Sequence, residues 1–285
     1  MTSSRKMCGK TSKPEWLKIR LPQSADYARV ASLVQRYGLH TICSSGKCPN
    51  ISHCWSAATA TFLIAGDICT RGCRFCATQS GRPLPLDSAE PSKIAHSVKV
   101  MELKHAVITS VTRDDLKDGG AAHWVQTIQA VRAESPETTI EVLIPDMQGK
   151  EELLDLIIAA RPDIIGHNVE TVRRLTPEVR SKATYEMSLG VLSYISEKGA
   201  EAKSSIMLGL GESEQEVLET LQDLYNVGVR RVTLGQYLQP TLNHTQVSEY
   251  VHPDKFEEYR QRALEMGFTH CESGPLVRSS YHAQM

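Results

Sequence analysis

Residues 61–76 read TFLIAGDICTRGCRFC and join a short apolar run to three closely spaced cysteines. The apolar run has the length of a strand buried on both faces, and a polar, glycine-containing loop follows it. From this point to the C-terminus, similar apolar or β-branched runs alternate with longer segments of helical period. That alternation predicts parallel βα units and therefore an α/β fold.

The alternation predicts six βα units. Their strands are expected at residues 61–66, 106–111, 139–144, 163–167, 202–208 and 231–237, and their helices at residues 90–102, 120–134, 150–160, 185–198, 214–227 and 253–266. Parallel crossovers are right-handed and neighbouring units pack side by side, so six units should curl into a partial (β/α)6 barrel. A doubly wound open sheet is the alternative. In both arrangements ligands bind at the carboxyl ends of the strands.

The predicted barrel covers residues 61–268, and a segment of different composition lies on each side of it. Residues 1–60 are irregular, rich in Ser, Pro, Lys and Cys, and contain one expected helix at residues 25–37. We expect them to form an N-terminal extension. Residues 269–285 are expected to form a C-terminal tail.

The bulk properties exclude several classes of protein. A net charge of −1 over 285 residues offers no basic field for nucleic acid, and no apolar run approaches the roughly 20 residues that span a bilayer. The N-terminus lacks the apolar region of a secretory signal, so we expect a cytoplasmic protein with no membrane partner. Eight cysteines are too sparse for a disulfide scaffold, and clustered cysteines in a reducing compartment more often bind metal.

Cys69, Cys73 and Cys76 stand directly after the first predicted strand with the spacing C-x3-C-x2-C. Three thiolates can bind three irons of a [4Fe–4S] cluster and leave the fourth iron open to an outside ligand. The alternatives are a structural zinc site and unrelated buried thiols. Zinc requires a fourth closing ligand, and the spacing of the nearby His53 matches no zinc ribbon or finger. The triplet therefore predicts a cluster that faces the pocket at the strand ends.

This triplet resembles the signature of the radical S-adenosylmethionine enzymes, including an aromatic residue, Phe75, immediately before the last cysteine. The resemblance implies that the open iron binds the amino and carboxylate groups of S-adenosylmethionine. It also implies that one electron cleaves this molecule to a 5′-deoxyadenosyl radical, and that Phe75 lies beside the adenine. Such a radical abstracts hydrogen from an unactivated C–H bond, which no side-chain acid or base can do.

A second triplet, Cys43, Cys48 and Cys54, lies in the N-terminal extension with the spacing C-x4-C-x5-C. A cluster there would order a segment that has little core of its own, and from the spacing alone zinc or free cysteines remain alternatives. The two triplets in this order resemble the lipoyl synthase family. In that family the first triplet holds an auxiliary [4Fe–4S] cluster.

The C-terminal stretch GPLVRSSYH at residues 274–282 resembles the R-S-S-Y tail of the same family. The resemblance implies that a serine oxygen is the fourth ligand of the auxiliary cluster. That serine is Ser280, which adjoins Tyr281, with Ser279 as the alternative. Taken alone, the motif would be typical of a disordered terminus. Serine is a poor ligand for a soft metal site beside thiolates, so its bond to iron is the expected weak point of the cluster.

The resemblance to lipoyl synthases covers nearly the whole chain from about Lys18. It includes the stretches at residues 109–120, 167–171, 207–212 and 235–240. The sequence departs from the family pattern at Ser44 and Ser45, where acidic residues are common, and at His53, where Glu is common.

Polar side chains follow several of the predicted strands. Asp114, Asn168, Glu170 and Gln236 are expected at the mouth of the barrel. A zwitterionic sulfonium with ribose hydroxyls requires carboxylates and amides, so these four residues are candidates for binding S-adenosylmethionine. The alternative for each is a role in a helix cap or a turn.

Two cysteines and five histidines fit no motif. Cys8 and Cys271 are expected to be a tail thiol and a packed small side chain. The histidines that receive no role are His105, His123, His244, His252 and His270.

The resemblance implies a sulfurtransferase with two [4Fe–4S] clusters and S-adenosylmethionine as co-substrate. Octanoyl-lysine on a lipoyl carrier protein, the glycine cleavage H protein or an E2 lipoyl domain, would receive sulfur from the auxiliary cluster at C6 and then at C8. A reduced donor such as ferredoxin or flavodoxin would supply the electrons. Two alternatives remain: a radical sulfur-inserting or methylthiolating enzyme with a small-molecule or RNA acceptor, and a non-enzymatic iron–sulfur or zinc protein.

Overall fold

The computed structural model describes residues 13–18, 25–56 and 60–280. Eight of its strands form one sheet in the order β1-β2-β5-β6-β7-β8-β9-β10. β1 pairs with β2 in antiparallel fashion, and every other neighbouring pair is parallel. The strands are β1 (His40–Thr41), β2 (Thr61–Ile64), β5 (His105–Ser110), β6 (Thr139–Leu143), β7 (Ile164–Gly166), β8 (Ala202–Leu208), β9 (Arg231–Gln236) and β10 (His270–Gly274). Two short strands, β3 (Ile68–Cys69) and β4 (Gln79–Ser80), pair separately.

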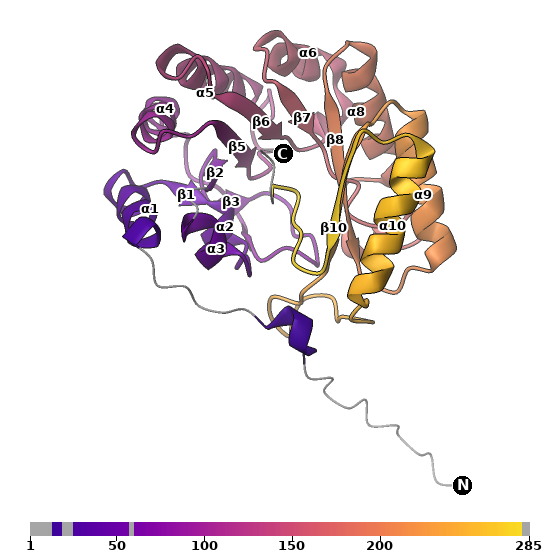
Figure 1. Ribbon diagram of the computed structural model, residues 1–285. Helices are drawn as coiled ribbons and strands as arrows, with labels where there is room; N and C mark the ends of the chain where they lie inside the picture. Colours follow the sequence, from indigo (N-terminus) through magenta and orange to yellow (C-terminus); the bar gives the residue numbers. More distant parts are fainter. Residues whose placement is uncertain (1–12, 19–24, 57–59, 281–285) are drawn as a thin grey trace, which may run out of the picture.

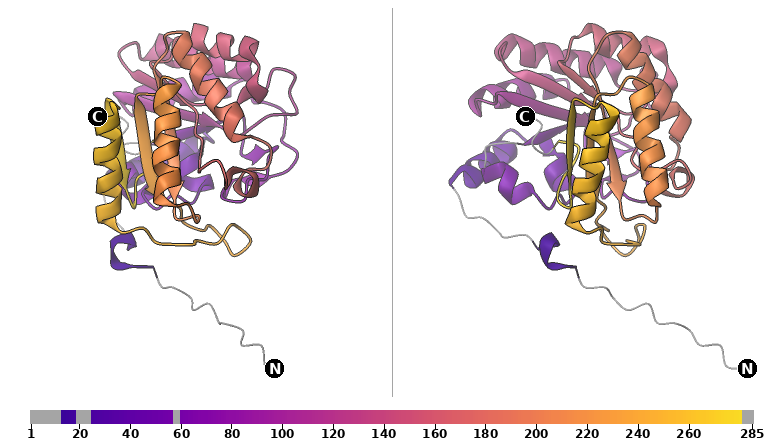
Figure 2. Two further views of the ribbon diagram at one scale, coloured as in Figure 1. Left: turned by 90° about the vertical axis from the view of Figure 1, so that its right-hand side faces the viewer. Right: turned by 45° about the vertical axis from the view of Figure 1, so that its right-hand side comes forward.

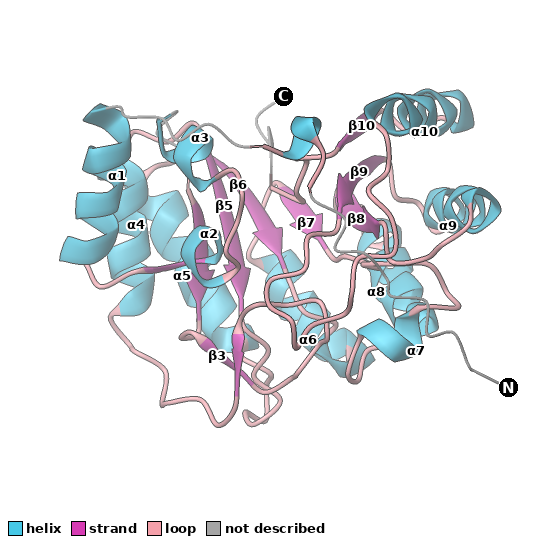
Figure 3. Cartoon of the chain, turned by 90° about the horizontal axis from the view of Figure 1, so that it is seen from below, coloured by secondary structure: helices cyan, strands magenta, loops and turns pink. Residues whose placement is uncertain are grey.

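The main sheet curves into an open arc whose connecting helices lie on the outer side (Figure 1; further views in Figure 2). These helices are α4 (Glu90–Val100), α5 (Ala121–Glu134), α6 (Glu151–Ala159), α8 (Tyr185–Glu197), α9 (Glu214–Asn226) and α10 (Pro253–Met266). Figure 3 shows α1 (Ala25–Arg36) at one end of the arc and α9 and α10 at the other. β1 and β10 are the sheet edges, so the expected partial barrel is confirmed. The doubly wound alternative is wrong because the connecting helices lie on one side of the sheet.

Local sequence signals account for several helix ends. Ser213 and Glu216 form the reciprocal hydrogen bonds of a capping box at the start of α9. The hydroxyl of Thr184 accepts the N–H of Met187 at the start of α8. Gly267 ends α10 with a φ of 103°, a conformation that glycine adopts without steric cost.

The sequence did not predict the strand β10 or three short helices. β10 lies within the predicted C-terminal tail and pairs in parallel with β9, although its sequence HCESG is too polar to indicate a strand. The N-terminal extension contains not only α1 but also α2 (Ile42–Ser45) and α3 (Ile51–Ser56), which are too short to show a helical period. A further short helix, α7 (Thr176–Val179), follows β7.

A buried ion network occupies the amino-terminal side of the strands. Glu141 accepts a hydrogen bond from Nζ of Lys203 at 2.6 Å, and its other oxygen lies 3.1 Å from Nε2 of His105. All three side chains are buried. Burial would raise the pKa of Glu141, but the hydrogen bond from His105 and the charge of Lys203 hold it below its ordinary value. The carboxyl-terminal side is the part of the sheet that remains open to ligands.

Two cysteines, Cys8 and Cys271, belong to neither triplet. Cys271 is a buried side chain within β10, whereas Cys8 lies outside the described residues. Among the described residues, no helix has both the length and the apolar character needed to cross a membrane.

Candidate active site

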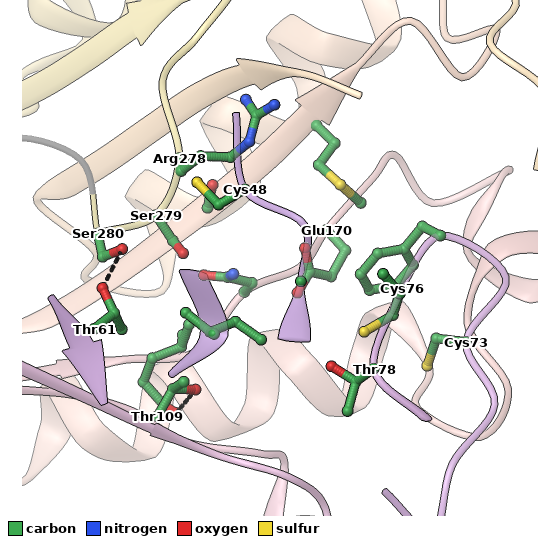
Figure 4. A pocket seen from close by; sticks show the side chains of 18 of the residues that line it. Cys48, Thr61, Cys73, Cys76, Thr78, Thr109, Glu170, Arg278, Ser279 and Ser280 are labelled. Carbon is green, nitrogen blue, oxygen red and sulfur yellow. Dashed lines mark hydrogen bonds between the residues drawn. The ribbon is translucent and has the colours of Figure 1, made fainter. Parts of the chain in front are cut away.

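A cavity of about 370 Å³ opens at the carboxyl ends of the strands. Figure 4 shows part of its lining: Cys48, Ser279 and Ser280 on one side, Cys73 and Cys76 on the other, and Glu170 between them. The cavity brings together most of the side chains that the sequence analysis selected. These are Cys43, Cys48, Cys54, Cys69, Cys73, Phe75, Cys76, Asn168, Glu170, Gln236, Ser279 and Ser280.

A tight turn leads from β2 into the cysteine loop. Ala65 and Gly66 both have positive φ, 66° and 90°, which is rare for alanine and costs free energy unless neighbours stabilise it. A carboxylate oxygen of Glu90 accepts the N–H of Ala65 at 2.7 Å, and Arg113 donates to the carbonyl oxygen of Ala65 at 3.1 Å. The turn directs the chain into β3, which ends at Cys69.

The thiol of Cys69 accepts two backbone hydrogen bonds, from the N–H groups of Arg71 and Thr112, both at 3.4 Å. The loop is also joined to the strand ends through its main chain, because the N–H of Thr70 donates to the carbonyl of Thr112 at 3.0 Å. These contacts fix the sulfur of Cys69 between the cysteine loop and the segment that follows β5.

Arg71, within the cysteine loop, lies between two carboxylates. It donates to both oxygens of Asp114 at 2.9 and 3.0 Å, and to both oxygens of Asp146 at 2.5 and 2.8 Å. The hydrogen bond from Arg71 lowers the pKa of Asp114 to about 2. Paired guanidinium–carboxylate contacts have fixed geometry, so this arrangement positions the loop against the ends of β5 and β6.

His244, which lies 168 positions after Cys76 in the sequence, contacts the same loop. Its Nε2 lies 2.9 Å from the carbonyl oxygen of Cys76, and Oγ1 of Thr241 lies 2.8 Å from its Nδ1. The neighbouring N–H of Thr245 donates to the carbonyl of Arg74 at 2.8 Å. The segment after β9 therefore packs against the cysteine loop, and His244, which received no role from the sequence, contacts its backbone.

The N-terminal triplet is held by two short helices. Cys43 lies in α2 and Cys54 in α3, and the N–H of Cys48 donates to the carbonyl of Cys43 at 3.0 Å. Burial raises the pKa of all three thiols, that of Cys54 to about 12, while a backbone hydrogen bond from Thr61 opposes the rise at Cys43. Burial therefore favours the neutral thiols, and a bound cation would offset that effect.

The C-terminal residues enter the same side of the cavity. Asn50, between Cys48 and Cys54, donates to the carbonyl of Leu276 at 2.5 Å, and the hydroxyl of Thr61 donates to that of Ser280 at 2.9 Å. Arg278 lies beside Cys48 (Figure 4), and its charge lowers the pKa of that thiol against the larger effect of burial. Residues 281–285, which include Tyr281 of the R-S-S-Y motif, lie outside the described residues.

Glu170 projects between the two groups of cysteines. Its φ of 71° departs from the strand conformation, and its main chain pairs with β8 through the N–H of Met207. Burial raises its pKa, while the charge of Arg180 and a hydrogen bond from Asn168 oppose the rise. A strained backbone at such a position is typical of a binding residue.

Arg180, which lines the same cavity as Glu170, is held by a chain of hydrogen bonds. Its guanidinium donates to Oγ of Ser188 at 2.6 Å, and that hydroxyl lies 3.0 Å from Nε2 of His167. Nδ1 of His167 lies 3.0 Å from the carbonyl oxygen of Ile144. Burial lowers the pKa of His167 to about 4, so the ring is neutral at pH 7, with its proton on Nδ1.

The donor set around the cavity fits iron–sulfur clusters. Six thiols are soft ligands of the kind that clusters use, Ser280 adds one hard oxygen donor, and among the described residues none of these cysteines is in a disulfide. No three His, Cys, Asp or Glu side chains in the described part of the chain converge closely enough to hold a single metal ion.

Comparison with known proteins identifies the family. Residues 63–224 match the Radical SAM superfamily. A lipoyl synthase of Parabacteroides distasonis is 57% identical over 272 residues, which cover 95% of this chain and 97% of that relative. A lipoyl synthase of Flavobacterium psychrophilum is 56% identical over 95% of this chain and 94% of its own. The chain belongs to the lipoyl synthase family. It is therefore an enzyme of the radical SAM superfamily, which brings S-adenosylmethionine and a [4Fe–4S] cluster as its cofactors.

Solved structures confirm the fold of this lipoyl synthase family member. SuiB of Streptococcus suis, bound to S-adenosylmethionine, has a TM-score of 0.62 at 11% identity, over 78% of this chain and 52% of that chain. Methylornithine synthase has a TM-score of 0.55 at 13% identity, over 88% of this chain and 79% of its own. At such identities the likeness concerns the fold alone.

Two predicted site residues in this lipoyl synthase family member make contacts that the sequence did not indicate. Both polar atoms of the Gln236 side chain are satisfied by backbone groups: Oε1 accepts the N–H of Val251 at 2.8 Å, and Nε2 donates to the carbonyl of Glu249 at 2.9 Å, among others. The side chain thus joins β9 to the segment that precedes α10. Asp114 lines a smaller neighbouring cavity instead of the main one and is occupied by Arg71.

Sequence reasoning missed several residues of the lipoyl synthase site. Asp146 follows the third predicted strand, so the rule that ligands gather at strand ends could have found it. Arg71 stands between two cysteines of the motif, but its partners lie 43 and 75 positions away. For Thr61, Arg180 and His244 no local signal exists, because their contacts depend on how distant segments pack.

Proposed function

We propose that this chain inserts two sulfur atoms, at C6 and then C8, into a protein-bound octanoyl-lysine. One observation carries the proposal: six thiols from two separate segments and Ser280 from the opposite end of the chain line one cavity. The comparisons support the family, and the separation of the two cysteine groups across the cavity supports two centres with different roles (Figure 4).

In this proposal Cys69, Cys73 and Cys76 hold the cluster that receives S-adenosylmethionine, with Phe75 beside the adenine. Asn168 and Glu170 face the cavity between the cysteine groups, and they are placed to bind the polar groups of the co-substrate. Asp114 acts indirectly through Arg71, and Gln236 through the backbone it supports. When bound, the first cluster supplies the electron that cleaves S-adenosylmethionine, and the second supplies the sulfur.

Cys43, Cys48, Cys54 and Ser280 are proposed as the ligands of the second, auxiliary [4Fe–4S] cluster. Arg278 lies beside Cys48, where its charge offsets the negative charge of a thiolate ligand set. Ser280 is preferred to Ser279 because its oxygen is already oriented by a hydrogen bond from Thr61, at the start of β2.

The wall of the cavity suits a fatty acyl chain. Its apolar lining includes Leu63, Val111, Leu143, Ile206 and Met207. Such a wall offers no competing hydrogen bonds and excludes water from a reactive radical. We propose that the acyl chain arrives on a lipoyl carrier protein, the glycine cleavage H protein or an E2 lipoyl domain, and that ferredoxin or flavodoxin supplies the electrons.

Anaerobic reconstitution and turnover on an octanoylated carrier domain test the proposal. We expect about eight irons per chain, dihydrolipoyl formation and release of 5′-deoxyadenosine. Replacing the three cysteines of either triplet by alanine should leave about four irons. Loss of Cys69, Cys73 and Cys76 should abolish deoxyadenosine formation. Loss of the N-terminal triplet should abolish thiolation only. About four irons in the unaltered chain, or deoxyadenosine without thiolation, contradicts the proposal.

Ser280→Ala and Ser279→Ala distinguish the two serines. Ser280→Ala should preserve cleavage of S-adenosylmethionine and lower sulfur insertion at least tenfold, an order-of-magnitude expectation for loss of one ligand from a metal site. Ser279→Ala should have little effect on either reaction. The reverse pattern would assign the ligand to Ser279, and unchanged lipoylation in both variants would remove serine from the ligand set.

A further inference from the structure

Thr61 lies where α2 of the N-terminal extension and the C-terminal segment around Ser280 meet. It is the first residue of β2, it is 5% exposed, and its hydroxyl donates to the hydroxyl of Ser280 at 2.9 Å although 219 positions separate them (Figure 4). This hydrogen bond places the serine oxygen beside the start of β2.

The same residue also contacts the N-terminal triplet. Its backbone N–H lowers the pKa of the Cys43 thiol against the larger effect of burial, and Cys43 is 6% exposed in α2. Asn50 provides a second connection between the same two segments through the carbonyl of Leu276. Thr61 thus interacts with one proposed ligand from the N-terminal triplet, Cys43, and with one from the C-terminal segment, Ser280.

The geometry is compatible with simultaneous binding of iron by Ser280. A serine oxygen that binds a metal retains lone pairs that can accept a hydrogen bond, and a bond to a charged oxygen is stronger than one between neutral groups. Threonine has restricted side-chain rotamers in a strand, and its strand neighbours are buried on both faces. The donor is therefore held in place, and little conformational entropy is lost when the bond forms.

We propose that Thr61 is a positioning residue for the auxiliary cluster: its hydroxyl orients the oxygen of Ser280 and so determines how firmly that oxygen closes the fourth position. This inference rests on the proposed function, because it requires a cluster at the N-terminal triplet. Without the hydroxyl, the serine oxygen is free to rotate away, and the cluster loses iron more readily.

The test uses the full-length holoenzyme and the rate at which a chelator removes iron, followed by absorbance. Thr61→Val removes the hydroxyl at nearly constant volume and should accelerate loss of the auxiliary iron about tenfold. Thr61→Ser keeps a hydroxyl and should remain within about twofold of the unaltered rate. Thr127→Val removes another buried hydroxyl, one that bonds within α5, and should change nothing.

A double variant shows whether Thr61 acts through Ser280. If it does, Thr61→Val combined with Ser280→Ala loses iron no faster than Ser280→Ala alone. Additive effects would show a general structural role and overturn the inference, as would an unchanged rate in Thr61→Val. Circular dichroism checks the fold of each variant, and Thr61→Ala provides a second chain without the hydroxyl should Thr61→Val fold poorly.

The iron content separates failure of this inference from failure of the proposed function. About eight irons per chain with equal rates in all variants would overturn the role of Thr61 and leave the proposed function standing. About four irons in the unaltered chain would remove the auxiliary cluster and, with it, both proposals.

Discussion

The guanidinium of Arg71 hydrogen-bonds both carboxylate oxygens of Asp146, at 2.5 and 2.8 Å. The carboxylate of Asp146 is fully buried, and Arg71 lies two residues beyond Cys69. Lysine cannot reproduce the planar pair of donors, so Arg71→Lys should shift the cysteine loop and lower deoxyadenosine formation per iron about tenfold or more. Arg82→Lys, an exposed change near the same loop, is the matched control. Equal rates for both variants would contradict a positioning role for Arg71.

His244 should affect binding of S-adenosylmethionine more than its cleavage. His244→Phe keeps a ring but removes the hydrogen bond to the carbonyl of Cys76, a bond of 2.9 Å. Loss of one such bond should raise KM for S-adenosylmethionine about fivefold while kcat changes little. Steady-state formation of deoxyadenosine measures both constants. Asn243→Ala, next to His244 and exposed, should behave like the unaltered enzyme.

Glu141→Gln should destabilise the fold without altering the site. The amide cannot neutralise Lys203, which would remain buried without a carboxylate partner. We expect the free energy of unfolding to fall by about 3 kcal/mol, as measured by urea denaturation. The exposed Glu137→Gln should cost almost nothing. Deoxyadenosine formation per folded chain should be unchanged, because Glu141 does not line the cavity; a selective loss of activity would contradict this assignment.

His167 should make stability depend on pH below about 6.5. Burial lowers its pKa from 6.5 to about 4, so between these values the unfolded chain binds a proton that the folded chain does not. Stability from this residue is complete above pH 6.5 and falls by about 1.4 kcal/mol per pH unit as the pH decreases toward 4. The free energy of unfolding of the unaltered chain minus that of His167→Gln should therefore decrease between pH 7.5 and pH 5.5. A constant difference would show that the ring titrates normally.

Some features follow from the sequence because they depend on residues close together in the chain. The six βα units appear in the alternation of apolar runs and helical periods, and the structure places each of them within a few residues of the prediction. The capping box of Ser213 and Glu216 is also local. The strand β10 was missed because parallel pairing with β9, and not its own polar sequence, makes it a strand.

The family, the partial barrel and the two cysteine triplets can all be derived from the sequence, since periodicity and spacing are properties of short segments. Three features emerge in the folded chain alone: Thr61 bonds Ser280, Arg71 joins Asp114 to Asp146, and backbone groups satisfy the side chain of Gln236. The physical reason is that a hydrogen bond depends on distance and direction between two groups. When those groups lie tens or hundreds of positions apart, the packing of the whole sheet sets both quantities, and no local pattern records them.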